Sequence, residues 1–204
     1  MVTLGITGGI GSGKSVAAES LRSRGAAVID GDEVARDLMG PGSPLLGEVA
    51  TAFGREVLRP DGSLDRRKLS RMVFGNLEAV ARLNAITHPP IMAEIRKRVE
   101  RLRSEGGAGI TCVVAPLLLE VGGRSLVDRL VVVWASEDER VRRVMARDGL
   151  SESEVRQRIA AQMPADEQLS QADWVVDTTQ GLEAAQRQLD RIWEEVRREA
   201  DYPC

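Results

Sequence analysis

The chain has 204 residues, a length that allows one well-buried core with insertions and leaves little room for a large second domain. Its 43% hydrophobic and 29% charged residues are typical of a soluble globular protein, and its net charge of -3 gives no argument for nucleic-acid or membrane affinity. The two cysteines, Cys112 and Cys204, form neither a metal-binding spacing nor a disulfide framework. We therefore expect a cytoplasmic protein that binds neither nucleic acid nor membrane.

The first predicted strand, residues 2–7, is followed at once by a glycine-rich loop. Such a loop lets successive backbone N–H groups converge on phosphate oxygens, while its lysine reaches the outer phosphates and its serine hydroxyl ligates Mg²⁺. A helical stretch follows, and its N-terminus would face the anion. The alternative is a glycine-rich turn formed by chance, but every fixed position of the motif is present. The predicted nucleotide-binding residues are Gly8, Gly9, Ile10, Gly11, Ser12, Gly13, Lys14, Ser15 and Val16, with Ser15 as the metal ligand.

Four further apolar runs predict strands over residues 26–30, 110–115, 129–135 and 173–177. Each run is nearly continuously apolar, as expected for strands whose two faces are both covered by helices. Helical stretches separate the runs, which favours a mostly parallel sheet. We expect the last two strands at the edges of this sheet.

Residues 33–105 have helical patterning and are too many for a simple connection between two strands. Turn signals at residues 41–44 and 59–62 divide them. We expect helices over residues 44–53 and 65–74 and from about 89 to 103, where Pro89 and Pro90 predict the start of the last one. This stretch is predicted to be an inserted helical subdomain.

Two capping boxes, Ser136 with Glu139 and Ser151 with Glu154, predict a helical hairpin after the fourth strand. Arg140, Arg143 and Arg147 share one face of its first helix. That face could close over a nucleotide as a lid or could be a solvated arginine stripe. We assign residues 137–170 to the lid, with Pro164 ending the second helix. An amphipathic helix from residue 182 is expected to cover the sheet, and Trp193 to join the core.

Asp32 closes the sequence Asp30-Gly31-Asp32 at the carboxyl end of the second strand, where open α/β sheets bind ligands. It could accept the proton of an acceptor hydroxyl in phosphoryl transfer, or it could cap a helix beginning at Glu33. Its position alone does not decide between these roles. No aspartate ends the third strand to supply a second magnesium ligand, and no guanine-specific NKxD motif occurs. The pattern favours a small-molecule kinase over a GTPase.

Together these segments resemble the dephospho-CoA kinase family, and the resemblance covers nearly the whole chain. The loop alone is shared with many kinases, so the later segments narrow the choice. The segments are Gly5-Ile6-Thr7-Gly8-Gly9-Ile10-Gly11-Ser12-Gly13-Lys14-Ser15, Val28-Ile29-Asp30-Gly31-Asp32 with Ala35-Arg36, Asp61-Gly62-Ser63-Leu64-Asp65-Arg66 with Val73-Phe74, His88-Pro89, and Pro116-Leu117-Leu118-Leu119-Glu120. The chain departs from the family's usual Asp-Asn at Asp177-Thr178 and from its basic residues after Gln162.

The resemblance implies an α/β, three-layer P-loop kinase fold that contains a five-stranded parallel sheet, an inserted helical substrate subdomain and a helical lid. It implies ATP-dependent phosphorylation of the ribose 3′-hydroxyl of dephospho-CoA, with Mg²⁺. The sequence does not give the oligomeric state, and a monomer is favoured. Asp32 would be the base, and Lys14 and Arg143 would attend the transferred phosphate. The implied substrate-side residues, besides Asp32, are Arg36, His88, Leu117 and Glu120. A kinase for another small hydroxyl or nucleotide acceptor, or a nucleotide-sensing protein without transfer activity, are the alternatives.

The core is expected over about residues 1–32, 106–136 and 171–204, with the acceptor-binding insertion over about 33–105 between its parts.

Overall fold

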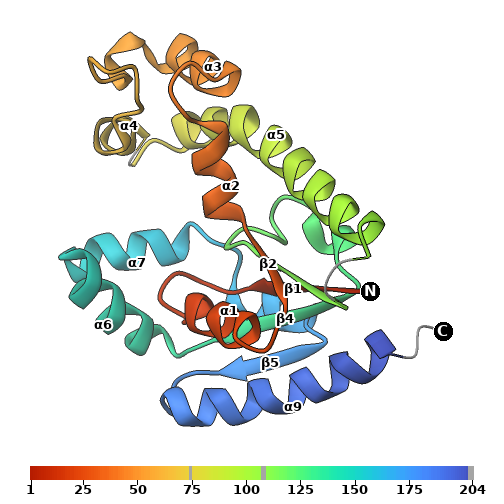
Figure 1. Cartoon of the computed structure of the whole chain (residues 1–204). Coiled ribbons are helices and arrows are strands. Elements are labelled where there is room, and N and C mark those ends of the chain that lie inside the picture. The colour runs from red at the N-terminus through yellow and green to blue at the C-terminus, as the bar shows by residue number, and fades with distance from the viewer. Residues whose placement is uncertain (74, 107–108, 202–204) are drawn as a thin grey trace. The chain divides into compact units, whose positions relative to one another are not determined.

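The computed structural model, which describes residues 1–73, 75–106 and 109–201, contains a five-stranded parallel sheet (Figure 1). The order of the strands is β2-β3-β1-β4-β5. Every pair of neighbouring strands in this sheet is parallel. The strands are β1 (Val2–Thr7), β2 (Ala27–Asp30), β3 (Ile110–Val114), β4 (Arg129–Trp134) and β5 (Trp174–Asp177). The predicted α/β class and the predicted strands are confirmed, with bounds that differ by no more than one residue.

Of the two strands predicted to lie at the edges of the sheet, one does and one does not. β5 lies at one edge, but β2 lies at the other, and β4 pairs with both β1 and β5. The expectation that β4 is an edge strand was therefore wrong. Residues 130–133 are all buried. An apolar run shows that both faces of a strand are covered, but it does not say which strands lie beside it.

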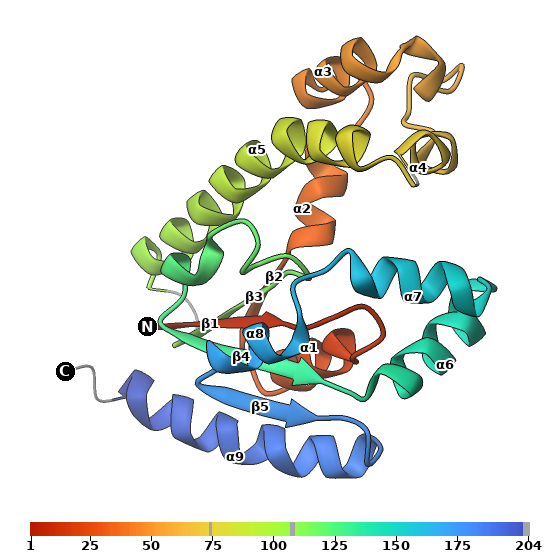
Figure 2. The same cartoon turned by 180° about the vertical axis from the view of Figure 1, so that it is seen from behind.

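One face of the sheet is covered by α1 (Lys14–Arg22) and α9 (Leu182–Asp201), which pack against each other and against β1 (Figure 2). Leu4 and Ile6 of β1 point into this core, and Leu189 of α9 is 1% exposed within it. The predicted C-terminal cover helix is confirmed, and Trp193 is partly buried against the core.

The opposite face of β1 carries Thr3, Gly5 and Thr7. Arg103, near the end of α5 (Leu77–Ser104), donates to Thr3 Oγ1 at 2.9 Å. A Cβ atom on Gly5 would come within 2.9 Å of Leu118, which lies in the turn after β3. Alternation along β1 therefore gives this strand an aliphatic face and a face of small residues that admits close packing.

The chain divides into two compact units, Met1–Asp30 with Arg98–Cys204, and Gly31–Lys97. The second unit contains α2 (Gly31–Leu38), α3 (Pro44–Phe53), the 3-10 turn η1 (Arg55–Val57), α4 (Arg66–Val73) and the first part of α5. It has a core of its own, formed by Leu46, Val49, Ala50, Val57, Leu64 and Leu69. The expected helices at 44–53 and 65–74 are present, and Phe74, like Cys204, lies outside the described residues.

The start expected for α5 was wrong. The helix begins at Leu77, so Pro89 and Pro90 lie in its interior. An interior proline removes a backbone hydrogen bond and costs about 3 kcal/mol, which is why the pair predicts a helix start. Packing on both sides opposes this cost: Leu83 contacts the core of the second unit, and Ile95 is 1% exposed.

The predicted hairpin consists of α6 (Glu137–Asp148) and α7 (Glu152–Ala160). Ser151 and Glu154 form the expected capping box, whereas Ser136 accepts from Glu139 N without the reciprocal bond. The hairpin has a small core of its own, formed by Val141, Val144 and Val155. Pro164 does not end α7 but precedes the short helix α8 (Ala165–Ser170), which was not expected. The 3-10 turn η2 (Gly123–Leu126) completes the described elements.

Candidate active site

The glycine-rich loop joins the carboxyl end of β1 to the N-terminus of α1. Gly8 has φ +144°, and a Cβ atom there would lie 2.1 Å from the carbonyl oxygen of Val133 in β4. Only glycine fits this close approach between backbones. Lys14 Nζ donates to the carbonyl oxygens of Gly8 and Gly9, at 2.6 and 2.9 Å. The ammonium group therefore lies against the first two loop residues.

The N-terminus of α1 is suited to hold an anion. Gly13, in the left-handed region with φ 98°, precedes the helix and makes no side-chain cap. The first amides of a helix have no carbonyl partner within it and carry a partial positive charge. Ser15 and Val16 are exposed in this first turn. The loop and the helix end together fit a nucleotide phosphate chain.

Two of the three arginines predicted for the lid face, Arg140 and Arg143, lie against this loop. Arg140 is 8% exposed, and its Nε donates to the carbonyl oxygen of Ile10 at 2.9 Å. A Cβ atom on Gly9 would lie 2.2 Å from the Arg140 guanidinium, so Gly9 admits this side chain. Burial lowers the pKa of Arg140, and Glu137 opposes this shift. Arg147 instead pairs with the adjacent Asp148 at 2.7 Å.

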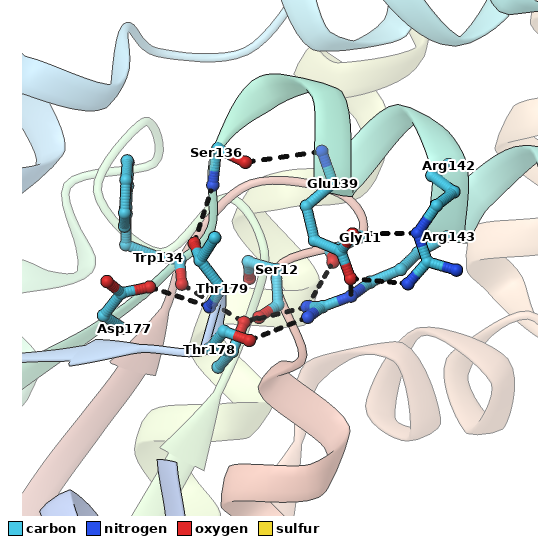
Figure 3. A network of polar contacts seen from close by, with 10 residues as sticks. All are labelled: Gly11, Ser12, Trp134, Ser136, Glu139, Arg142, Arg143, Asp177, Thr178 and Thr179. Carbon is cyan, nitrogen blue, oxygen red and sulfur yellow. Dashed lines mark hydrogen bonds and ion pairs between the residues drawn. The ribbon is translucent and has the colours of Figure 1, made fainter. Parts of the chain in front are cut away.

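Arg143 connects α6 to the loop and to the segment after β5, as Figure 3 shows. Its guanidinium donates to Oγ1 and O of Thr178, each at 2.8 Å, and to Gly11 O at 3.4 Å. Thr178 Oγ1 in turn donates to Ser12 O at 2.8 Å. The arginine face is therefore not a solvated stripe at positions 140 and 143.

Glu139 holds two arginines of α6 in place. Its carboxylate accepts from Arg142 at 2.7 and 2.8 Å and from Arg143 Nε at 2.8 Å (Figure 3). The hydrogen bond from Arg142 is the main reason that the pKa of Glu139 falls to about 2, with Arg143 contributing in the same direction. Glu139 is therefore ionised at neutral pH and orients Arg143 toward Thr178.

Two residues beside the loop were missed by the sequence reasoning. Thr178 follows the carboxyl end of β5, a position that belongs to the ligand crevice of open α/β sheets, and this was the available signal. Gln162, in the segment between α7 and α8, accepts the N–H of Ile10 at 2.8 Å. Nothing in the spacing of Gln162 indicates this contact, because 152 residues separate the two.

Three of the predicted site residues lie in the second unit. Asp32 is exposed in the first turn of α2, which begins at Gly31. The alternative that Asp32 caps a helix beginning at Glu33 was therefore wrong. Arg36 lies one turn later and donates from Nε to Asp32 O at 3.3 Å. His88 is half-buried within α5.

The remaining predicted residues, Leu117 and Glu120, lie in the turn after β3. Leu117 is half-buried, and the exposed Glu120 accepts from Met163 N through Oε1 at 3.2 Å. Residues 1–73, 75–106 and 109–201 contain no group of three or more histidine, cysteine, aspartate or glutamate side chains arranged to hold a metal. No helix in the same ranges has the length and apolar character needed to cross a membrane.

Comparison with known proteins gives one consistent family. Residues 2–184 match the family model described as dephospho-CoA kinase. A dephospho-CoA kinase of Anaeromyxobacter dehalogenans is 46% identical over 197 residues, which are 97% of this chain and 93% of that protein. A crystal structure from Thermus thermophilus is 37% identical with a TM-score of 0.78, and the match covers 95% of this chain and 97% of that one.

The fold extends to other small-molecule kinases. A shikimate kinase of Bacteroides thetaiotaomicron matches with a TM-score of 0.53 at 15% identity, covering 96% of this chain and 98% of that one. At this identity the match concerns the fold alone, which is that of the P-loop kinases. The family model and the relatives cover the loop, the insertion and the hairpin together: the chain belongs to the dephospho-CoA kinase family.

Proposed function

We propose that the chain transfers the γ-phosphoryl group of ATP to the ribose 3′-hydroxyl of dephospho-CoA, giving coenzyme A and ADP. The observation that carries this proposal is the phosphate loop, with Lys14 against Gly8 and Gly9, in a chain of this family. The bond between the γ-phosphorus and the β,γ-bridging oxygen breaks, and a bond to the 3′-oxygen forms. The proton of the hydroxyl leaves with a base.

Asp32 is proposed as that base. Its carboxylate is exposed and follows β2 by two residues, at the carboxyl end of the strand, where open α/β sheets bind their ligands. A carboxylate there can orient the acceptor hydroxyl and take its proton. Arg36, on the same helix, and His88, Leu117 and Glu120 are proposed to contact dephospho-CoA, which the inserted helices would bind.

Lys14 and Arg143 are proposed to neutralise charge on the transferred phosphoryl group. Phosphoryl transfer requires positioning and electrostatic stabilisation more than covalent catalysis. The 27% exposed Arg143 side chain beside Gly11 and the partly buried Lys14 ammonium support these roles. Arg140 also lies against the loop, at 2.9 Å from the carbonyl oxygen of Ile10, and adds positive charge there.

Mg²⁺ is proposed to accompany ATP, with the exposed Ser15 hydroxyl as its protein ligand. Magnesium retains several waters and is usually bound by few protein groups together with substrate phosphates, so one hydroxyl at the start of α1 fits it. Held there, a magnesium ion would supply positive charge that offsets the negative charge of the phosphate groups. The enzyme is also proposed to be cytoplasmic and monomeric. Sedimentation of the purified protein would test the proposed oligomeric state.

The proposed reaction is tested by incubating the protein with Mg²⁺, ATP and dephospho-CoA and measuring ADP and coenzyme A. Equal amounts of both products are expected. Formation of neither above background would refute the proposal. ADP formed only with another hydroxyl acceptor from a panel would instead identify a kinase of different specificity.

The role of Asp32 is tested by Asp32→Asn, which retains the shape of the side chain but removes the base. The kcat is expected to fall by roughly 10²-fold or more, with the affinity for ATP nearly unchanged. The control is Glu33→Gln, the adjacent exposed carboxylate in α2. An Asp32→Asn protein with wild-type kcat would exclude Asp32 as the base, and a wild-type protein that binds ATP without turnover would be a nucleotide sensor.

A further inference from the structure

Both backbone polar groups of Ile10, at the centre of the phosphate loop, are bound by side chains that lie 130 and 152 residues later in the chain. Its N–H donates to Gln162 Oε1 at 2.8 Å, and its carbonyl oxygen accepts from Arg140 Nε at 2.9 Å. Gln162 Oε1 also accepts from the Arg140 guanidinium at 3.4 Å. Since both groups facing Gln162 are donors, its amide oxygen is the atom that must face them. The three residues form a closed set of hydrogen bonds.

The side chain of Ile10 is held by the same part of the chain. It packs against the core of the α6–α7 hairpin, formed by Val141, Val144 and Val155. Gly9 and Gly11 also lie against α6, but they have no side chain. Ile10 is therefore the loop residue through which the backbone and the apolar packing of the hairpin both act.

The segment that carries Gln162 is anchored independently of the loop. The N–H of Met163 donates to Glu120 Oε1 at 3.2 Å, in the turn after β3. The carbonyl oxygen of Met163 accepts from Nε2 of Gln168, a residue of α8 that is 4% exposed. Gln162 therefore precedes a residue, Met163, whose backbone is held by Glu120 on one side and by Gln168 on the other.

We infer that Gln162 is a positioning residue for ATP binding: it holds the phosphate loop through Ile10 and couples the loop to the α6–α7 hairpin. The inference rests on the proposed use of ATP. Gln162 acts through Ile10 and Arg140, because its amide oxygen faces those two protein groups. A hairpin that moves must either carry Ile10 with it or break these bonds, so hairpin position and loop shape change together.

The test compares Gln162→Met, which keeps the length of the side chain and removes its acceptor, with Gln157→Met on the exposed side of α7. Loss of the acceptor leaves two part-buried donors unpaired, so the dissociation constant and the KM for ATP are expected to rise about 10-fold. The KM for dephospho-CoA is expected to stay within about 2-fold of the wild-type value, because the substitution acts on the phosphate loop. A general loss of protein stability would instead impair the binding of both substrates. Gln157→Met is expected to behave as wild type.

Hydrogen exchange of peptides covering residues 8–13 gives a second readout that needs no acceptor substrate. Exchange is expected to accelerate at least about 10-fold in Gln162→Met, because the amide of Ile10 loses its partner. Gln162→Glu retains oxygens that face the same donors, so exchange is expected to return to the wild-type rate. If Gln162→Met does not fold, faster loop exchange in Gln162→Glu than in wild type overturns the inference.

Unchanged ATP affinity and loop exchange in Gln162→Met, with only a lower midpoint of thermal unfolding, would also overturn the inference. These outcomes are distinct from failure of the proposed reaction. A wild-type protein that binds ATP but makes no coenzyme A would refute the proposed acceptor. The role of Gln162 would then still be decided by the ATP affinity and the loop hydrogen exchange of Gln162→Met. A wild-type protein that does not bind ATP refutes both.

Discussion

At Gly8 the backbone of the phosphate loop passes so close to β4 that no side chain fits. In Gly8→Ala the new Cβ would meet the carbonyl oxygen of Val133 at 2.1 Å, and φ +144° is unfavourable for an L-residue. We expect the affinity for ATP to fall at least about 100-fold, because the loop must shift away from the strand. Calorimetric titration with ATP measures this.

The control for Gly8→Ala is Gly47→Ala, on the exposed side of α3, where a Cβ would have nothing within 4 Å. Alanine is there expected to raise the free energy of unfolding by about 0.5–1 kcal/mol, because it has the higher helix propensity. Its affinity for ATP should equal that of wild type. Tight ATP binding by Gly8→Ala would contradict the role assigned to this loop.

Glu139 gives a pH signature of the arginine network. Its pKa in the folded protein is about 2, against 4.5 for an ordinary glutamate, so the unfolded chain takes up the proton first. The stability that it contributes is present above about pH 4.5 and is lost as the pH falls toward 2. We expect Glu139→Gln to lower the thermal midpoint at pH 7 and to converge with wild type near pH 2.

Thermal melts of both proteins from pH 2 to pH 7 check this expectation for Glu139. High salt should narrow the difference, because the side chain is 20% exposed and its ion pairs are partly screened. A difference that stays constant down to pH 2 would mean that Arg142 and Arg143 do not lower the pKa of Glu139.

Within β3, Cys112 is fully buried, and burial raises the pKa of its thiol to about 12. The fraction of Cys112 present as thiolate at pH 8 is then roughly 10³-fold below that of an exposed thiol. Because the thiolate is the reactive form, Cys112 is expected to react slowly in the folded protein. In a Cys204→Ala variant, which leaves one thiol, labelling by a disulfide reagent is expected only on unfolding. Labelling in denaturant is the positive control, and rapid labelling of the native protein would contradict the burial of β3.

The elements that could be predicted from the sequence are those that local chemistry determines. Continuous apolar runs located every strand, and Ser151 with Glu154 located the start of α7, because burial and capping act on residues near in the chain. The start of α5 could not be predicted this way. Tertiary packing of residues such as Leu83 and Ile95 offsets the cost of two interior prolines, and local patterns do not include that term.

The candidate site shows the same division. The loop from Gly8 to Ser15 is one contiguous motif, so its strand and helix context was predictable. Its supports come from residues that are distant in sequence: Gln162 and Thr178 lie more than 150 residues from the loop atoms that they bind. Strand order also depends on such distant pairing, which explains the wrong edge assignment of β4.

For the molecule as a whole, the two units have separate cores, so the two substrates can be perturbed separately. Val57 is fully buried in the core of the second unit. Val57→Ala is expected to cost about 1.5–3 kcal/mol locally and to raise the KM for dephospho-CoA, since the inserted helices are proposed to bind it. The affinity for ATP is expected to stay within about 2-fold.

The matched change in the first unit is Val155→Ala, which is equally buried in the core of the α6–α7 hairpin. This variant should weaken ATP binding more than acceptor binding, because Ile10 packs against the same core. Steady-state kinetics with each substrate varied in turn separate the two effects. Identical changes in both variants would argue against the division of labour proposed for the two units.

The strand order also has a consequence for biosynthesis on the ribosome. β1 and β2, made within the first 30 residues, do not pair with each other; β3, which begins at Ile110, is the strand that joins them. Residues 31–97 have their own core and leave the ribosome before β3 does. In the nascent chain, residues 31–97 are therefore expected to fold first, and β1 and β2 are expected to remain unpaired until β3 has been synthesised. The nucleotide loop is translated before residues 31–97, but it is expected to acquire its shape after them, once β3 has joined the sheet.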